Sequence, residues 1–260
     1  MNHTSAYILS GETNMFYITG DTHGSFYRIE KFCRLMGTTK NDTIIILGDV
    51  GLNYYLNQKD AESKEKVESL PIKFFCIHGN HEERPQNVPG YKEVDYLGGK
   101  AFVQEEYPSI AFAKDGEVYN IEGNSVLVLG GAYSVDKNYR LSMGYSWFRS
   151  EQIPDNEKIE IEKKIENIGW KIDYVLSHTC PYNTRPVHMF LSCIDQRSVD
   201  SSMEIWLQKI SEKIVFKEWY FGHYHGDWNN GKYTMLFNGI VPFPNSTGNL
   251  ASANETTFNE

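Results

Sequence analysis

The sequence predicts an α/β fold in which two packed mixed β-sheets are flanked by helices, an α/β/β/α sandwich. Apolar, strand-like runs alternate with helical segments in the first part of the chain, which is typical of parallel strands with helical crossovers. Short strands separated by turn signals follow in the middle of the chain. Helical segments return in the last part, so helices are available for both outer faces of the strands.

The first part supplies three expected strands and two expected helices. The strands are Met15–Thr19, Thr43–Leu47 and Ile72–Ile77. The second is a continuous, mostly β-branched run, as expected of a strand buried on both faces. Between the strands, Phe26–Met36 has apolar residues at helical spacing and ends before Gly37. Lys59–Leu70 is polar and charged, so we expect a surface helix that Pro71 terminates.

The middle of the chain changes character. Four short strands are expected, at Lys100–Val103, Ile110–Lys114, Glu117–Ile121 and Val126–Leu129. Asp115-Gly116 and Gly123-Asn124 are typical turn dipeptides between them. We expect these strands to form a second group that packs on the first.

The last part adds two strands, Tyr174–Leu176 and Trp219–Phe221, and two helices. One helix begins at Asp155, has Ile161, Ile165 and Ile168 on one face and ends at Gly169. The other begins with a capping-box pattern of Ser201 and Glu204 and reaches about Lys213.

Lys232–Val241 supplies one or two final strands. No linker or internal repeat divides the sequence. We therefore expect a single domain over residues 1–244, followed by a polar C-terminal tail over residues 245–260.

Composition excludes several classes of protein. The chain has 260 residues, enough for one large α/β domain, and its net charge of −9 argues against a long nucleic-acid partner. No apolar stretch approaches the length of a membrane span, so no membrane partner is expected. The four cysteines form no CxxC pair, and residues 1–11 show no signal-peptide pattern. These features predict a cytoplasmic protein.

Five short polar blocks follow strand-like runs. They are Gly20-Asp21-Thr22-His23-Gly24, Gly48-Asp49-Val50-Gly51, Gly79-Asn80-His81-Glu82, Ser177-His178-Thr179-Cys180-Pro181 and Gly222-His223-Tyr224-His225-Gly226. Strands of an open α/β sheet present ligand-binding groups at their carboxyl ends. Buried carboxylates and imidazoles are costly unless they are paired or bound to metal, so the clustering predicts a metal centre.

The ordered set of blocks resembles the calcineurin-like metallophosphoesterase family. The resemblance spans residues 20–225 and implies seven metal ligands: Asp21, His23, Asp49, Asn80, His178, His223 and His225. It implies two divalent ions, with Asp49 as the bridging candidate because a carboxylate has two oxygens. Asp21, His23 and His225 would complete one shell, and Asn80, His178 and His223 the other.

The resemblance also implies a reaction. A metal-bridging hydroxide would attack the phosphorus, and His81 would give a proton or hydrogen bond to the leaving oxygen. The mixed ligand set suits Mn, Fe, Zn, Co or Ni. The chain is therefore expected to hydrolyse a small phosphate mono- or diester, with a nucleotide as one candidate. A phosphoprotein phosphatase and a non-catalytic metal-binding scaffold are the alternatives.

Substrate-binding residues are less well marked. Many family phosphatases continue the second block with an Arg near the phosphate, but this chain reads Gly51-Leu52-Asn53-Tyr54. Lys137 and Arg140 are the expected replacements, with solvated surface cations as the alternative, and Arg185 comes next. Seven aromatic residues in predicted loops could stack on a base or simply pack: Tyr54, Tyr55, Tyr133, Tyr139, Trp147, Tyr182 and Trp228.

Four further residues in or next to the blocks are not expected to bind metal or take part in the reaction. His78 is expected to be structural, and Glu82 and Glu83 to lie on a solvated loop face. Cys180 is expected to serve packing rather than reaction.

Overall fold

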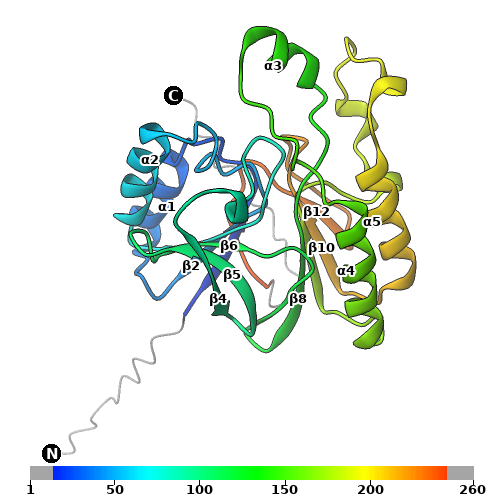
Figure 1. The fold of residues 1–260 in the computed structure, drawn as a ribbon. Coiled ribbons are helices and arrows are strands. Elements are labelled where there is room, and N and C mark those ends of the chain that lie inside the picture. Colours follow the sequence, from blue (N-terminus) through cyan, green and yellow to red (C-terminus); the bar gives the residue numbers. More distant parts are fainter. Residues whose placement is uncertain (1–13, 245–260) are drawn as a thin grey trace, which may run out of the picture.

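In the computed structural model, residues 14–244 form two β-sheets that pack face to face, with helices on both outer faces (Figure 1). This confirms the predicted α/β/β/α sandwich. The predicted tail over residues 245–260 lies outside the described residues, as do residues 1–13. No helix of the described part is both long enough and apolar enough to span a membrane.

The first sheet has seven strands, and its centre is parallel. Its strands in spatial order are β13 (Val241–Pro242), β1 (Phe16–Thr19), β2 (Thr43–Ile46), β3 (Lys73–Cys76), β6 (Ile110–Ala113), β5 (Gly99–Gln104) and β4 (Tyr91–Tyr96). The pairs β1–β2, β2–β3 and β3–β6 are parallel, while β13, β5 and β4 pair antiparallel with their neighbours. The ends of β1, β2 and β3 therefore lie at one edge.

The second sheet has six strands and repeats this plan. Its strands in spatial order are β11 (Trp228–Asn229), β12 (Tyr233–Met235), β10 (Glu218–Phe221), β9 (Tyr174–Ser177), β8 (Asn124–Leu129) and β7 (Val118–Ile121). The strands from β12 to β8 are mutually parallel, and β11 and β7 pair antiparallel at the two edges. The carboxyl ends of β9 and β10 are thus neighbours.

Helices cover the outer faces of the sandwich. The helices are α1 (Tyr27–Met36), α2 (Gln58–Glu68), α3 (Lys137–Met143), α4 (Asp155–Asn167) and α5 (Ser202–Lys213), with short 3₁₀ turns at η1 (Pro85–Asn87), η2 (Tyr182–Thr184), η3 (Val187–Met189) and η4 (Gln196–Ser198). In Figure 1, α1 and α2 lie on the side of the first sheet and α4 and α5 on the side of the second, while α3 projects at the top.

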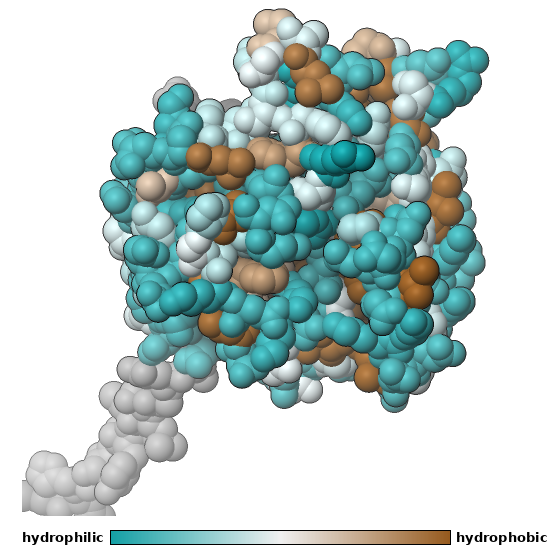
Figure 2. Space-filling view, viewed as in Figure 1, coloured by the Kyte–Doolittle hydropathy of each residue, from teal (hydrophilic) through white to brown (hydrophobic). Residues whose placement is uncertain are grey.

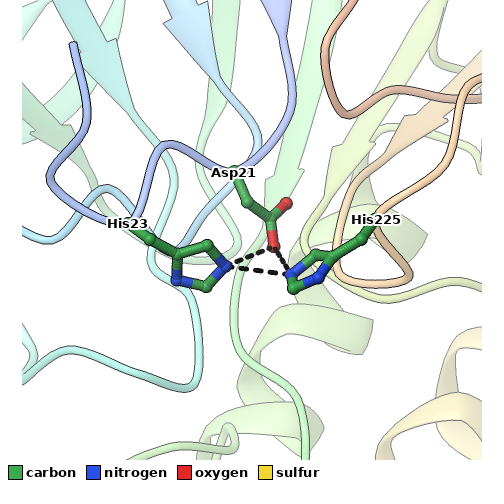
Figure 3. Close-up of side chains that lie close together, drawn as sticks. All are labelled: Asp21, His23 and His225. Carbon is green, nitrogen blue, oxygen red and sulfur yellow. Dashed lines mark hydrogen bonds and ion pairs between the residues drawn. The ribbon is translucent and has the colours of Figure 1, made fainter. Parts of the chain in front are cut away.

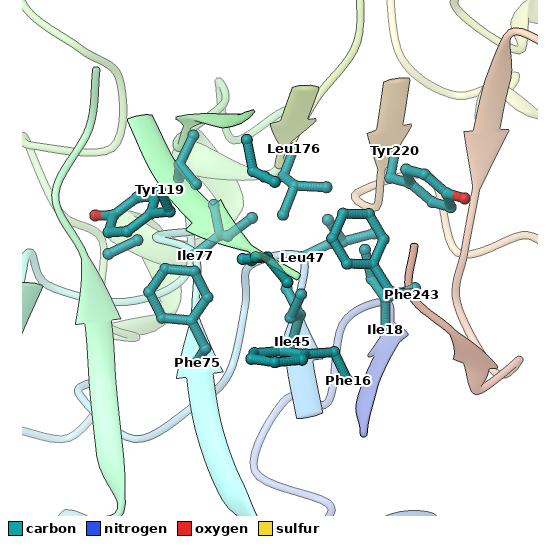
Figure 4. Close-up of a cluster of buried hydrophobic side chains, with 14 of the residues drawn as sticks. Phe16, Ile18, Ile45, Leu47, Phe75, Ile77, Tyr119, Leu176, Tyr220 and Phe243 are labelled. Atoms are coloured by element: carbon teal, nitrogen blue, oxygen red, sulfur yellow. The ribbon is translucent and has the colours of Figure 1, made fainter. Parts of the chain in front are cut away.

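The main core lies between the two sheets. Ile45, Leu47 and Phe75 of the first sheet meet Tyr119 and Leu176 of the second, all fully buried (Figure 4). A fully buried side chain of this size contributes about 1.5–3 kcal/mol. This layer therefore fixes the strand ends that carry the polar blocks.

The alternation along β2 explains why its sequence is continuously apolar. Ile45 faces the second sheet, whereas Ile44 and Ile46 pack with Ile29 of α1 and Val67 of α2. Both faces of β2 are covered, as the β-branched run predicted. The outer face of the second sheet packs in the same way against α4 and α5.

The predicted grouping of the middle strands was wrong. Strands β5 and β6 extend the first sheet, and only β7 and β8 join the second. The Asp115-Gly116 turn is therefore a crossing between sheets rather than a hairpin. Asp115 anchors this crossing, because it pairs with Arg84 and accepts the Gly130 N–H at 2.6 Å. Strand periodicity does not reveal such a change of partner.

Two local predictions also need correction, and two elements were missed. Ser201 caps α5 without a side-chain bond to the helix, and Glu204 instead accepts a hydrogen bond from Thr179. The capping box is therefore absent. Ile168 lies at the carboxyl cap of α4 and is 47% exposed, outside the buried face of Ile161 and Ile165. Strand β4 and helix α3 were not predicted, because both segments are largely polar.

Candidate metal centre

The five polar blocks meet at one edge of the sandwich. The blocks follow β1, β2 and β3 of the first sheet and β9 and β10 of the second. Because these strands are parallel within each sheet, their carboxyl ends converge. The seven predicted ligands lie here as two neighbouring groups joined by Asp49.

The first group consists of Asp21, His23 and His225 (Figure 3). Asp21 Oδ2 lies 3.4 Å from His225 Nε2 and 3.7 Å from His23 Nε2, and the two imidazole nitrogens are 2.9 Å apart. Asp21 Oδ2 is buried and has no hydrogen-bond partner among the described residues. A cation between these three atoms would satisfy that oxygen.

The second group contains Asn80, His178 and His223. His178 Nδ1 donates a hydrogen bond to the Leu47 carbonyl at 2.7 Å, which leaves Nε2 as an unprotonated acceptor in the neutral ring. Asn80 Nδ2 donates to Ser134 Oγ at 2.9 Å, and this bond turns Asn80 Oδ1 toward His178 Nε2. The two acceptors, His178 Nε2 and Asn80 Oδ1, lie 2.9 Å apart. Two acceptors at this distance repel each other, and a cation bound between them would remove that repulsion.

His223 completes the second group. Its ring centroid lies 5.0 Å from that of His178. Burial lowers the pKa of His223 to about 3. The imidazole is therefore neutral at physiological pH, the form that binds metal.

Asp49 faces both groups. Its Oδ1 lies 3.6 Å from His178 Nε2, and its Oδ2 lies 3.9 Å from His23 Nδ1. Burial alone would raise the pKa of this carboxyl, but the charges of His178, His81 and His23 outweigh burial and lower it. Asp49 is thus ionised, with one oxygen toward each group.

The backbone around the site is strained. His23, Asp49, His223 and His225 all have positive φ, between 45° and 68°. A non-glycine residue in this region costs energy, and such residues concentrate at functional sites. The glycine of the third block has a different role, because a Cβ on Gly79 would collide with Asp49. The ligand loops touch through their backbones, which only glycine permits.

Glu82 overturns the expectation of a solvated loop face. Its side chain is 0% exposed. Oε1 accepts the N–H groups of Val50 at 3.1 Å and Gly79 at 3.2 Å, and Oε2 accepts that of Gly51 at 3.3 Å. Burial and the charge of Asp49 raise the pKa of Glu82 to about 8. The carboxyl group therefore links the loop of Asp49 to the loop of Asn80. No signal in the sequence distinguishes Glu82 from its neighbour Glu83 in this role.

Glu83 also departs from a solvated face. It is half-buried and accepts hydrogen bonds from Asn87 and Ser150. His78 is buried and hydrogen bonds through Nε2 to the Glu82 carbonyl at 3.0 Å. Burial raises the pKa of the Cys180 thiol well above its ordinary value, so this cysteine is protonated.

Arg140 of α3 lies beside His81. The guanidinium Nη2 is 3.4 Å from His81 Nε2, and Nη1 donates to the Tyr54 hydroxyl at 3.2 Å. Nε donates to Asp136 at 2.7 Å, which holds the side chain in place. His81 Nε2 in turn lies 3.9 Å from Asp49 Oδ2. Burial lowers the pKa of His81, and the charge of Asp49 opposes this shift.

The other candidate cations lie elsewhere. Lys137 Nζ stands 3.9 Å from the centre of the Trp147 ring, so the structure does not bring it to Arg140 and His81. Arg185 stacks on Tyr182 and donates to Ser201 Oγ at 3.2 Å, on the wall of the cavity beside the metal ligands.

The predicted aromatic residues are dispersed. Tyr54 contacts Arg140 and Tyr133 lines the cavity, whereas Tyr55, Tyr139 and Trp228 are exposed. Figure 2 shows apolar surface on the projection that carries α3.

A cavity of about 410 Å³ opens beside the ligands. One wall consists of ligand loops and contains Asp49, Asn80 and His223. The opposite wall comes from residues 185–204 and is largely apolar, with Met189, Phe190, Leu191, Ile194 and Val199. The cavity therefore has one face of candidate metal ligands and one apolar face that suits the organic part of a ligand.

A family model described as calcineurin-like phosphoesterase matches residues 15–227. The chain matches no curated protein. The solved structure of TT1561 from Thermus thermophilus is similar at 14% identity and a TM-score of 0.47, over 86% of this chain and 89% of that one. The protein of unknown function AQ665 from Aquifex aeolicus matches at 15% identity and a TM-score of 0.34, over 66% and 82%.

Proposed function

The chain belongs to the calcineurin-like phosphoesterase family, and from this premise we propose that it hydrolyses a small phosphate mono- or diester with the help of two divalent metal ions. The family supports metal-dependent phosphoester hydrolysis as the class of reaction. The substrate class, the ligand set and the residue roles below are our proposals.

The observation that carries the proposal is the buried Asp21 Oδ2, which has no hydrogen-bond donor among the described residues and lies within 3.7 Å of the His23 and His225 imidazoles. In addition, His178 Nε2 and Asn80 Oδ1 lie 2.9 Å apart, and because His178 Nδ1 donates to the Leu47 carbonyl, the neutral ring presents Nε2 as a second acceptor. The donor set of carboxylate, imidazole and amide oxygen fits Mn, Fe, Zn, Co or Ni. Asp21, His23 and His225 would hold one ion, and Asn80, His178 and His223 the other, with Asp49 shared.

When bound, two such ions supply an acidified water and a clamp for the oxygens of the phosphoryl group. The protein's own contribution is to fix the ligands and to complete the charge around the substrate. His81 lies next to the two groups of candidate ligands, with Nε2 3.9 Å from Asp49 Oδ2. We propose that an N–H of its imidazole gives a hydrogen bond or a proton to the leaving oxygen of the substrate.

Arg140 is the proposed phosphate-binding cation. Its Nη2 lies next to His81, and Tyr54 and Asp136 hold the other guanidinium nitrogens. A guanidinium fixed in this way can contact a non-bridging phosphoryl oxygen that the ions do not reach. It would replace the Arg that is missing after the second block.

The proposal is tested with purified protein and generic esters. Metal analysis after loading with Mn²⁺ should find two ions per chain, and the loaded protein should hydrolyse bis(p-nitrophenyl) phosphate or p-nitrophenyl phosphate. Asp49→Asn should abolish hydrolysis and lower the occupancy of both ions, because the shared carboxylate loses a charge. A wild-type chain that binds a single ion, or that hydrolyses neither ester with any of the five metals, would refute the proposal.

A further inference from the structure

The cavity beside the metal centre contains a carboxyl group that the phosphoester chemistry does not use. Glu204 of α5 lines the cavity and is only 5% exposed. Its Oε1 accepts the Thr179 hydroxyl at 2.8 Å, while Oε2 is buried and has no hydrogen-bond partner among the described residues. A buried carboxyl oxygen without a hydrogen-bond partner is costly, so Oε2 indicates that a ligand hydrogen bonds to it.

The hydrogen bonds around Glu204 show that its neighbours' donors are already used. Thr179 donates to Glu204, so it accepts from the Tyr224 hydroxyl at 3.0 Å. Arg185, the nearby cation, donates instead to Ser201 and to the Tyr182 carbonyl. Glu204 Oε2 therefore remains the open acceptor of this wall.

The surroundings of Glu204 suit a flat, mostly apolar group. The rings of Phe190 and Tyr224 stack on each other, at 19° with centroids 6.1 Å apart, and the Arg185 guanidinium lies 5.7 Å from the centre of the Phe190 ring. Leu191, Ile194 and Val199 extend the apolar surface. Aromatic side chains of this kind stack on nucleobases, at about 1–3 kcal/mol per base.

We propose that this wall is a base-binding subsite, and that it takes a purine with an exocyclic amino group that donates to Glu204 Oε2. The inference rests on the proposed function, since it makes the organic part of the phosphoester a nucleoside. The phosphoryl group would lie at the metal ligands and the base against Phe190 and Tyr224. An aliphatic chain would fill the apolar wall but would leave the Glu204 oxygen without a donor.

A binding experiment tests the subsite without any hydrolysis. 2-Aminopurine riboside is fluorescent and carries the amino group but no phosphate. We expect its fluorescence to be quenched by Mn²⁺-loaded wild-type protein and restored by adenosine, with purine riboside, which has no amino group, competing about ten-fold less well. This factor corresponds to loss of a hydrogen bond to a charged group. Equal competition by the two ribosides would overturn the proposal, as would absence of binding.

Variants locate the contact. In Glu204→Gln the amide oxygen can still accept from Thr179, which places an NH₂ donor where Oε2 stood. The preference for adenosine over purine riboside should then disappear. Phe190→Leu should weaken both ribosides and keep their ratio. Glu212→Gln, the same change on the exposed face of α5, is the matched control and should behave as wild type. A preference that survives in Glu204→Gln would refute the assignment.

Hydrolysis links the subsite to the reaction. The p-nitrophenyl esters of adenosine 5′-phosphate and purine riboside 5′-phosphate share one leaving group, so their kcat/KM ratio reports base recognition alone. We expect a ratio of about ten in the wild type and near one in Glu204→Gln. If neither these esters nor bis(p-nitrophenyl) phosphate is hydrolysed, the phosphoesterase function fails while riboside binding still decides the subsite. If bis(p-nitrophenyl) phosphate is hydrolysed and the ratio is one in the wild type, the subsite alone fails.

Discussion

Removing the Glu82 carboxyl group should weaken both the fold and the metal centre. Glu82 is fully buried and accepts three backbone N–H groups, two from the Asp49 loop and one from the Asn80 loop. Glu82→Ala would leave these three donors without an acceptor. Glu82→Gln would keep an oxygen for Val50 and Gly79 and place an NH₂ group against the Gly51 N–H.

The expected magnitudes follow from this count. An unsatisfied buried donor costs about 1–3 kcal/mol, and water entering the space left by the side chain favours the lower end. We therefore expect Glu82→Ala to lower the free energy of unfolding by about 3–5 kcal/mol. Glu82→Gln replaces one acceptor, so about 1–2 kcal/mol is expected. Because the loops that carry Asp49 and Asn80 would loosen, Mn²⁺ affinity should fall about 10–100-fold in Glu82→Ala.

Urea unfolding of the metal-free protein measures the first effect, and calorimetric titration with Mn²⁺ measures the second. Glu105→Ala is the control, because Glu105 is a 77% exposed partner of Lys92 and its loss should change stability by less than about 1 kcal/mol. The reasoning is refuted if Glu82→Ala matches Glu105→Ala in stability. If Glu82→Ala is destabilised but binds Mn²⁺ with wild-type affinity, Glu82 stabilises the fold and has no effect on metal binding.

Three further predictions concern the residues around the ions. His81→Ala should keep both ions and should slow esters with high-pKa leaving groups far more than p-nitrophenyl esters, whose leaving group needs little protonation; equal slowing of both, or loss of metal, contradicts the assigned role. Arg140→Ala should raise KM and affect monoesters more than diesters, because a monoester dianion has more charge to satisfy, while Lys137→Ala on the same helix should have little effect; unchanged kinetics of Arg140→Ala would move the phosphate contact to another cation. His223 titrates at a pKa of about 3 when folded and about 6.5 when unfolded, so the chelator-treated protein should lose stability as the pH falls from about 6.5 to 3, and His223→Gln should flatten that part of the melting-temperature profile; an identical profile in the variant would contradict the shift.

The positions of the candidate ligands could be predicted because the family resemblance marks the residues and the strand ends bring them to one edge. A buried parallel strand ends in a turn, and the turn that follows places its polar side chains at the common edge of the sheet. Asp21, Asp49 and His178 therefore meet although they come from distant parts of the chain. The same rules could not assign β5 and β6 to the first sheet, since apolar periodicity records burial but not the identity of the neighbouring strand.

Glu82 shows why adjacent residues of one block could not be distinguished. Glu82 and Glu83 have the same side chain and the same polar context in sequence, yet one is fully buried and the other half-buried. What separates them is the row of unpaired N–H groups on the Asp49 and Asn80 loops, which exists only after those loops have come together. Burial of Glu82 is thus a consequence of the metal centre's geometry and has no local cause.

Arg140 extends this point to the substrate. The chain lacks an Arg after its second block, and Tyr54 of the following segment instead binds a guanidinium that arrives from α3. Helix α3 has no buried residue of its own, and Arg140 connects it to Tyr54 and His81 of the first sheet's loops. The same side chain therefore anchors a projecting helix and supplies charge beside His81. In the proposed phosphate contact, Arg140 would therefore bring its charge to the substrate from a segment that follows none of the five polar blocks.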